Sequence, residues 1–322
     1  MTTQQRTVRD LTRSAAPAGV DDLLEQALEN LESTMHDVVD SDVTVLRDAS
    51  RHILDAGGKR IRPRLMFLSY LAAGGRNVHA AVPLAAAVEL MHTASIVHDD
   101  INDHGVMRRG RPSVNAIWGR TFALLTGDYF FTKVYELMAP FGDLNGELAV
   151  AAVALVEGET LQAAAVKENR LNREVYNDII GRKTAALFSA SGRMGARLAG
   201  APVAYVDALG SFAFQVGLAF QIVDDVLDLI ASPEKIGKTS GIDLEQGKGF
   251  AAAYQGDLAN GGEGDPMEKI KAKLLKGDAV NEARMLSRAL VDGAIAGLAI
   301  LPDSDAKDAL IDVANMVIDR EF

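Results

Sequence analysis

The sequence predicts an all-α fold, and three features of its composition and pattern support this prediction. Apolar residues make up 48% of the 322 residues but aromatic residues only 6%, so aliphatic side chains dominate the core. Alanine and leucine, which are abundant, favour helices, whereas strands favour aromatic and β-branched side chains. Apolar residues recur at spacings of three and four, and no alternating pattern runs for more than a few residues.

The first expected helix begins near Val20, where Leu24, Leu28, Leu31 and Met35 recur at helical spacing with acidic residues between them. Glycine and proline separate the later apolar stretches, and no segment resembles an interdomain linker. We therefore expect a flexible lead-in at residues 1–19 and one large helical domain at 20–322. Further helices are expected at residues 65–73, 82–97, 122–138, 148–166, 174–198, 203–229 and 283–300.

Composition excludes several classes of protein. A net charge of −11 without a long basic tract argues against nucleic-acid binding. The absence of cysteine excludes disulfides, thiolate metal sites and thiol catalysis, and fits a reducing compartment. Residues 148–156 form one of the longest uninterrupted apolar runs, far short of the ~18 residues of a membrane span. We therefore expect a cytoplasmic protein with no membrane span and no signal peptide.

Two segments repeat the pattern DDxxD, and each ends a long apolar stretch. In a helix the first and last Asp share one face, where like charges cost about 0.2–0.5 kcal/mol per pair, so nearby cations are expected. Carboxylates are hard oxygen ligands that suit Mg²⁺, which also recruits substrate phosphates. A solvated helix end is the alternative, but it explains two such motifs poorly. The candidate metal ligands are Asp99, Asp100, Asp103, Asp224, Asp225 and Asp228.

Basic residues form a second group of candidates. The pair Gly57-Gly58 precedes four cations, Lys59, Arg60, Arg62 and Arg64, and another cluster at 108–111 follows the first acidic motif. Arginine binds diphosphates bidentately and lysine supplies a point charge. A solvated charge run is the alternative. Together with the acidic motifs, the pattern indicates a polyanion held between protein cations and Mg²⁺.

These motifs together resemble those of trans-isoprenyl diphosphate synthases, of the long-chain polyprenyl or geranylgeranyl type. The resemblance covers roughly residues 20–250, with the motifs in the order typical of the family. It implies a helical bundle of the isoprenoid synthase type with a central active-site cavity, a Mg²⁺ cofactor and a homodimer. The matching segments are GGKRIRP at 57–63, HTASIVHDDINDHGVMRRGRP at 92–112, RKT at 182–184 and FQIVDDVLDL at 220–229.

The resemblance also implies a role for individual residues. The two DDxxD motifs and Lys183 are the catalytic residues. His98 and His104 are interpreted as structural. The residues that correspond to the isopentenyl diphosphate site are Lys59, Arg62, His92 and Arg109. Those that correspond to the allylic diphosphate site are Arg108, Lys183, Thr184, Gln221, Lys238 and Lys248.

The implied reaction is head-to-tail prenyl transfer, in which an allylic diphosphate loses pyrophosphate and isopentenyl diphosphate attacks the resulting cation. Apolar helical walls would exclude water from that cation. One segment departs from the family pattern. Where such enzymes often continue Thr-Leu-Pro after the Lys248 motif, this chain reads Gly249-Phe250-Ala251-Ala252.

Product length is expected to depend on the helix before the first acidic motif. Related enzymes with short products carry bulky aromatic residues four and five positions before the motif. Here these positions hold Ser95 and Ala94, with Met91 one turn deeper, which predicts a product of geranylgeranyl length or longer. Tight helix packing is the alternative role for both small residues. Candidate residues for the tunnel floor are Phe130, Phe131 and Tyr135.

Three other functions remain open from the sequence. A terpene cyclase would share the first acidic motif and the fold, but typically carries a mixed ligand set in place of the second. A non-catalytic subunit of a heteromeric synthase typically loses one or both motifs. A helical oligomeric scaffold with charged ends is the most general alternative.

Overall fold

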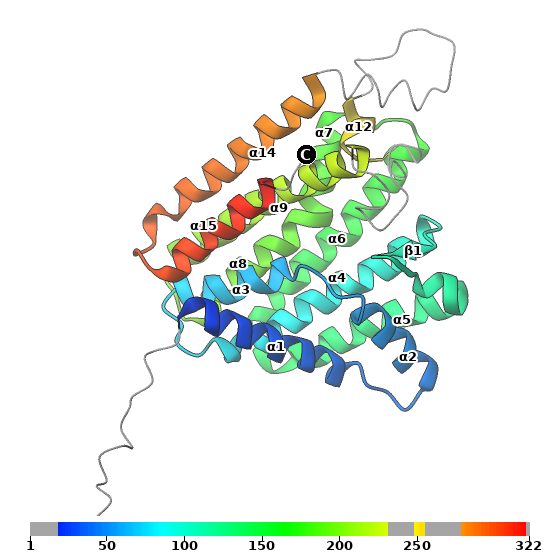
Figure 1. The fold of residues 1–322 in the computed structure, drawn as a ribbon, viewed down its shortest axis with the longest axis horizontal. Coiled ribbons are helices and arrows are strands. Elements are labelled where there is room, and N and C mark those ends of the chain that lie inside the picture. Colours follow the sequence, from blue (N-terminus) through cyan, green and yellow to red (C-terminus); the bar gives the residue numbers. More distant parts are fainter. Residues whose placement is uncertain (1–18, 231–247, 255–277, 320–322) are drawn as a thin grey trace, which may run out of the picture.

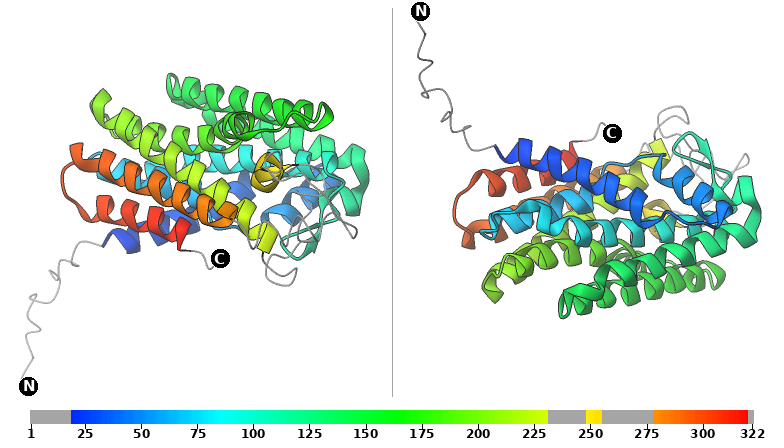
Figure 2. Two further views of the ribbon diagram at one scale, coloured as in Figure 1. Left: turned by 90° about the horizontal axis from the view of Figure 1, so that it is seen from above. Right: turned by 90° about the horizontal axis from the view of Figure 1, so that it is seen from below.

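The computed structural model describes residues 19–230, 248–254 and 278–319, and it confirms the all-α class. The long helices run roughly along one axis as a bundle (Figures 1 and 2). Lys238 lies outside the described residues. In chain order the elements are α1 (Val20–Val38), α2 (Thr44–Leu54), α3 (Ile61–Ala72), η1 (Val78–Ala81), α4 (Val82–Asn102), β1 (Met107–Arg108), β2 (Arg111–Pro112), α5 (Val114–Met138), η2 (Ala139–Phe141), α6 (Leu144–Lys167), α7 (Arg173–Ile180), η3 (Gly181–Ala185), α8 (Ala186–Leu198), α9 (Val203–Ile230), α12 (Gly249–Tyr254), α14 (Asp278–Gly297), η5 (Leu298–Ile300) and α15 (Asp305–Ile318).

Helices α4 and α9 form the centre of the fold and carry the two acidic motifs. Helix α4 contacts α1, α3, α5 and α8, and α9 contacts α8, α14 and α15. Most of α4 is buried, including Leu84, Val88 and Leu90. Burial on several sides explains why both helices are apolar almost all round, rather than along one stripe. Each acidic motif lies near the C-terminal end of its helix.

Several helices begin where a side chain caps them, which the spacing of apolar residues did not reveal. Helix α5 begins at Val114, earlier than the expected residue 122, because the Ser113 hydroxyl accepts a hydrogen bond from the Ala116 amide at 3.1 Å. A backbone break at Gly119, with φ of 79°, separates this first turn from the rest. Helix α15 is likewise capped by Ser304. Neither α2 nor α15 was among the expected helices.

The expected helix at 174–198 is interrupted by a π-helical turn, η3, that contains Arg182, Lys183 and Thr184. Such turns insert an extra residue into a helix and are frequent at functional sites. Gly158 of α6 packs directly against this turn, since a Cβ at that position would lie only 2.6 Å from the Lys183 backbone nitrogen. The close approach of α6 and η3 therefore depends on a glycine.

Among the described residues, three helical segments are long and apolar enough to cross a membrane, by length and composition alone. These segments were not expected from the sequence, because polar residues interrupt their apolar runs. In the segment of η1 and α4, 72% of the most apolar 18-residue stretch is buried within the protein. In α9 the buried share of that stretch is 56%. In α6 this share is only 22%, so α6 presents an apolar surface that the single chain does not cover.

Candidate active site

A cavity of about 840 Å³ lies between the two acidic motifs. Its walls come from the segment before α3, from α4, the hairpin at 107–112, α6, α7, η3 and α9, and from Lys248. The cavity thus brings together segments far apart in the sequence, as the resemblance implied. The predicted site residues that line it are Lys59, Arg62, His92, Ser95, Asp99, Asp103, Arg108, Arg109, Lys183, Thr184, Gln221, Asp224, Asp225, Asp228 and Lys248.

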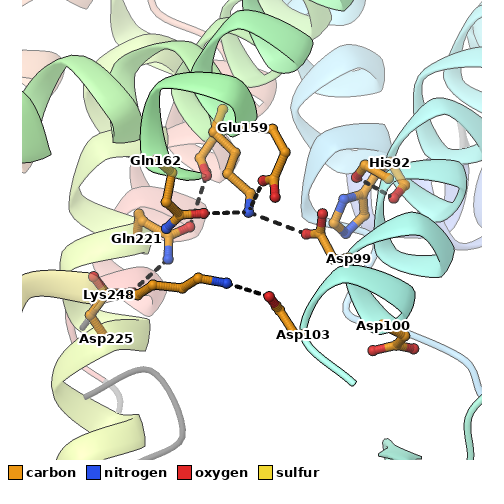
Figure 3. A network of polar contacts seen from close by, with 12 residues as sticks. His92, Asp99, Asp100, Asp103, Glu159, Gln162, Gln221, Asp225 and Lys248 are labelled. Atoms are coloured by element: carbon orange, nitrogen blue, oxygen red, sulfur yellow. Dashed lines mark hydrogen bonds and ion pairs between the residues drawn. The ribbon is translucent and has the colours of Figure 1, made fainter. Parts of the chain in front are cut away.

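In the first acidic motif, two aspartates face the cavity and meet lysines from distant segments (Figure 3). Lys183 Nζ lies 3.3 Å from the Asp99 carboxylate, and Lys248 forms an ion pair with Asp103. Burial raises the pKa of Asp99 to about 6, although Lys183 opposes this shift. The pKa of Lys183 is also raised, because Asp99 and Glu159 together outweigh the effect of its burial. These are the compensating cations that the spacing of the motif predicted.

Asp100 takes a different direction from its two neighbours. Its side chain is buried and accepts hydrogen bonds from Arg108 Nε at 3.1 Å and Nη2 at 2.7 Å. It does not line the cavity, and Figure 3 shows it turned away from Asp99 and Asp103. The structure thus places Asp100 where it orients Arg108, rather than with the expected ligand set.

In the second motif, Asp224, Asp225 and Asp228 all line the cavity, but their surroundings differ. Asp224 is exposed to the cavity, and Asp228 is only 6% exposed. Asp225 accepts hydrogen bonds from the Gln221 amide at 2.7 Å and the Tyr176 hydroxyl at 2.8 Å. Gln221 in turn accepts a hydrogen bond from Thr184 at 2.8 Å, which joins η3 to α9.

The opposite wall of the cavity is basic and depends on a buried ion-pair network. Arg60, with φ of 50°, is 7% exposed and binds Glu32 of α1 and Glu89 of α4. The bond from its Nη1 to Glu89 is 2.9 Å long. This network ties the Gly57-Gly58 loop to two helices. It thereby fixes the direction of Lys59 and Arg62 on either side of Arg60.

Arg62 is a buried cation with an unused donor. Its side chain packs over the Phe188 ring at 4.6 Å, and among the described residues its Nε has no hydrogen-bond partner. Burial lowers its pKa to about 10, although Glu89 and Asp224 oppose the shift, so the group stays charged near neutral pH. A buried, charged donor without a partner is costly unless an anion binds it. The site therefore fits an anionic ligand.

Arg109 and His92 complete this wall. The Arg109 guanidinium lies close to Gly58, because a Cβ added to Gly58 would be 3.0 Å from an Arg109 nitrogen. The missing side chain of Gly58 thus leaves room for Arg109. Burial lowers the pKa of His92 well below 6.5, and nearby Arg62 and Arg109 lower it further. His92 is therefore neutral near neutral pH, so it can offer a hydrogen bond but no positive charge.

Two polar residues of α6 were missed by the sequence analysis. Gln162 accepts a hydrogen bond from Lys183 Nζ at 3.0 Å, and Glu159 forms an ion pair with the same lysine. They are three positions apart on one helical face, in the polar stretch 157–162 that separates apolar runs at 148–156 and 163–166. That interruption of an apolar stretch was the signal in the sequence.

Of the predicted chain-length residues, only Ser95 reaches the cavity, together with its neighbour Ile96. Ala94 is fully buried and Met91 is 4% exposed, and neither lines the cavity. In the structure Ala94 therefore packs among the helices and is not part of the cavity lining. Among the candidate floor residues, Phe130 is fully buried, whereas Tyr135 is 72% exposed and points to solvent.

The carboxylates that line the cavity form a donor set suited to Mg²⁺. Asp99, Asp103, Asp224 and Asp228 offer only carboxylate oxygens from the two sides of the cavity, which suits a hard cation. Within residues 19–230, 248–254 and 278–319, no three acidic or histidine residues converge on one point. This arrangement fits Mg²⁺, which is held by one or two carboxylates and takes its other ligands from substrate phosphates and water.

Comparisons with known proteins agree with this geometry. Residues 43–272 match the family described as polyprenyl synthetase. The chain belongs to that family. The all-trans-nonaprenyl-diphosphate synthase (geranyl-diphosphate specific) of Rhodobacter capsulatus is 32% identical, over 90% of this chain and 94% of the relative. A short chain isoprenyl diphosphate synthase of Methanothermobacter thermautotrophicus is 36% identical, over 92% and 96%.

A solved structure supports the same conclusion. The polyprenyl synthase of Caulobacter crescentus, complexed with calcium and isoprenyl diphosphate, matches with a TM-score of 0.86 and 31% identity. The match covers 95% of this chain and 99% of that one. As a member of the family, the chain is a prenyltransferase. This rules out the helical scaffold and argues against a terpene cyclase.

Proposed function

We propose that the protein condenses isopentenyl diphosphate with an allylic diphosphate, head to tail and with Mg²⁺, to make an all-trans product of geranylgeranyl length or longer. One observation carries this proposal: a single cavity is bounded by two facing acidic motifs and by a separate basic wall. Two diphosphates need two sets of cations, and the cavity provides them. A non-catalytic subunit would not need both motifs directed into it.

The basic wall is proposed to bind isopentenyl diphosphate. Arg62 would use its unpartnered Nε for this anion, and Lys59 and Arg109 would flank it. Neutral His92 adds a hydrogen bond without further charge. Because Arg62 is held by packing over Phe188, little side-chain entropy is lost when the anion binds.

The allylic diphosphate is proposed to bind between the acidic motifs, where it would meet Arg108, Lys183, Thr184, Gln221 and Lys248. We extend this assignment to Lys238 by family resemblance. Bound Mg²⁺ would neutralise charge that develops on the departing pyrophosphate. Asp99, Asp103, Asp224 and Asp228 would hold it, and Asp100 and Asp225 would orient other groups.

The apolar part of the cavity is proposed to take the growing chain. Ser95 and Ile96 of α4 line the cavity, as do the apolar side chains of Leu171, Ile179 and Phe220. These side chains exclude water from an allylic cation. The small side chain of Ser95 leaves room for chains longer than farnesyl. The two relatives compared above differ in the length that their names give, so the length for this chain rests on Ser95 rather than on similarity.

We further propose a homodimer in the cytoplasm. Val150, Val153 and Val156 on successive turns of α6 are 73%, 58% and 58% exposed, and Phe122 and Leu125 of α5 are also exposed. An exposed apolar surface of this kind marks a protein–protein interface. A second copy of the chain is the occupant that explains why α6 is apolar without being buried. The absence of cysteine supports a reducing compartment.

Removal of one aspartate from each motif tests the proposed reaction. Asp99→Ala and Asp224→Ala should each lower turnover about 10³-fold, by analogy with the loss of a main electrostatic group. Asp312→Ala, at an exposed position on α15, is the matched control and should keep wild-type turnover. Near-normal turnover in either motif variant, with the fold intact, would refute the two-motif site.

A further inference from the structure

Both carboxylate oxygens of Asp225 are engaged by protein donors. Oδ1 accepts a hydrogen bond from the Gln221 side chain at 2.7 Å. Oδ2 accepts one from the Tyr176 hydroxyl at 2.8 Å and one from the Phe250 backbone amide at 2.9 Å. The three donors come from α9, α7 and α12, so this one carboxylate joins three helices.

Phe250 lies in the segment that departs from the family pattern, and the structure gives that departure a role. Its side chain is 4% exposed, and its ring packs edge-on against Tyr176 with 5.8 Å between centroids. It belongs to a small apolar cluster, separate from the main core, that includes Ile222, Val226 and Ala283. An aromatic side chain thus fastens α12 to α7, α9 and α14.

Two residues before Phe250, Lys248 extends into the cavity and forms an ion pair with Asp103 of the first motif (Figure 3). The six described residues of helix α12, Gly249–Tyr254, contact α7 and α9. The backbone amide of Phe250, in the first turn of this helix, donates a hydrogen bond to Asp225. The direction of Lys248 therefore depends on contacts that α12 makes with the rest of the protein.

We propose that Tyr176, Asp225 and Phe250 form an anchor that positions Lys248 at the mouth of the cavity. In this anchor Asp225 is a positioning residue that acts through the Phe250 amide, rather than a ligand of the metal. The inference rests on the proposed function for its link to the allylic diphosphate. The three hydrogen bonds occupy three of the roughly four acceptor positions of the carboxylate, which leaves little room for a cation.

The anchor predicts that Tyr176→Phe, which removes one hydroxyl and keeps the ring, loosens α12. In the protein without substrate, hydrogen exchange of the amides at 249–254 should become at least about tenfold faster, since local opening costs less. Tyr205→Phe, at a partly buried tyrosine on α9 outside the cavity, should leave this exchange unchanged. Unchanged exchange in Tyr176→Phe would overturn the anchor.

Kinetics then test whether the anchor acts through Lys248. Tyr176→Phe and Lys248→Ala should each raise KM for the allylic substrate about tenfold, more than KM for isopentenyl diphosphate. Because both changes disable the same group, the double variant should be no worse than Lys248→Ala alone. Losses that multiply in the double variant would contradict action through Lys248.

The metal dependence separates the two roles of Asp225. Asp225→Asn should leave the Mg²⁺ concentration for half-maximal activity within about twofold of wild type, while hydrogen exchange at 249–254 becomes faster. A large rise in that concentration with normal exchange would make Asp225 a ligand and overturn the inference. Hydrogen exchange does not depend on catalysis. If the wild-type protein showed no prenyl transfer, the proposed function would be refuted, and the exchange measurements would still test the anchor.

Discussion

His92 lies among arginines, and at the scale of the single residue this gives a testable pH dependence. Burial and the guanidinium groups of Arg62 and Arg109 lower its pKa in the folded state. In the unfolded chain the pKa returns to about 6.5. Below that pH the unfolded state binds a proton that the folded state does not, so stability falls as the pH falls.

When the pH falls from about 7.5 to about 5.5, protonation of His92 in the unfolded chain should lower the free energy of unfolding by up to about 1.4 kcal/mol. In His92→Gln that loss should disappear, because glutamine does not titrate. His79→Gln, which removes an exposed imidazole instead, should keep the wild-type pH dependence. Chemical denaturation at both pH values measures the difference. An equal acid sensitivity in His92→Gln and wild type would show that His92 is not held neutral.

At the scale of the element, helix α4 presents two different faces at neighbouring positions. Ser95 lines the cavity, and its hydroxyl donates a hydrogen bond to the His92 carbonyl at 2.8 Å. Ala94 is fully buried against other helices. The same substitution should therefore have unlike effects at the two positions.

Ser95→Phe should shorten the product, because its ring would enter the cavity in the path of the chain. Ala94→Phe should instead overpack the core and cost about 1–3 kcal/mol of stability. Chromatography of the dephosphorylated products, with a thermal melt of each variant, distinguishes the two. Unchanged product length in Ser95→Phe would contradict the proposed path of the growing chain.

The elements also show how far the sequence could predict the site. The acidic and basic motifs were predictable, because like charges at helical spacing require counter-charges, and Lys183 and Lys248 supply them. The direction in which each aspartate of the motifs points was not predictable. Asp100 turns toward Arg108, and Asp225 toward Tyr176 and Phe250, and both contacts depend on tertiary packing. The π-turn at Lys183 also left no periodic signal.

At the scale of the whole molecule, the exposed face of α6 should hold two copies together. Val153→Lys would place a charge in the centre of this face, since Val153 is 58% exposed and flanked by Val150 and Val156. Light scattering should then give the mass of one chain, 34.3 kDa, where the wild type gives twice that. Val203→Lys, at an exposed valine on α9, should stay dimeric. A dimeric Val153→Lys variant would place the interface elsewhere.

The whole fold was more predictable than its helix boundaries. Burial of α4 and α9 on several sides agrees with their nearly continuous apolar sequence. Helices α2 and α15 were not expected from the sequence, and the cap at Ser304 that starts α15 is a local hydrogen bond rather than a periodic pattern. The role of Phe250 could not be predicted, since its partners on α7 and α9 are distant in the sequence.

The central claim is that one cavity holds two diphosphates and joins their chains. Release of pyrophosphate from farnesyl diphosphate tests this most directly, measured with and without isopentenyl diphosphate and with and without Mg²⁺. We predict rapid release only when all three are present, with a product of geranylgeranyl length or longer. Release from farnesyl diphosphate alone, or no release with all three present, would contradict the account.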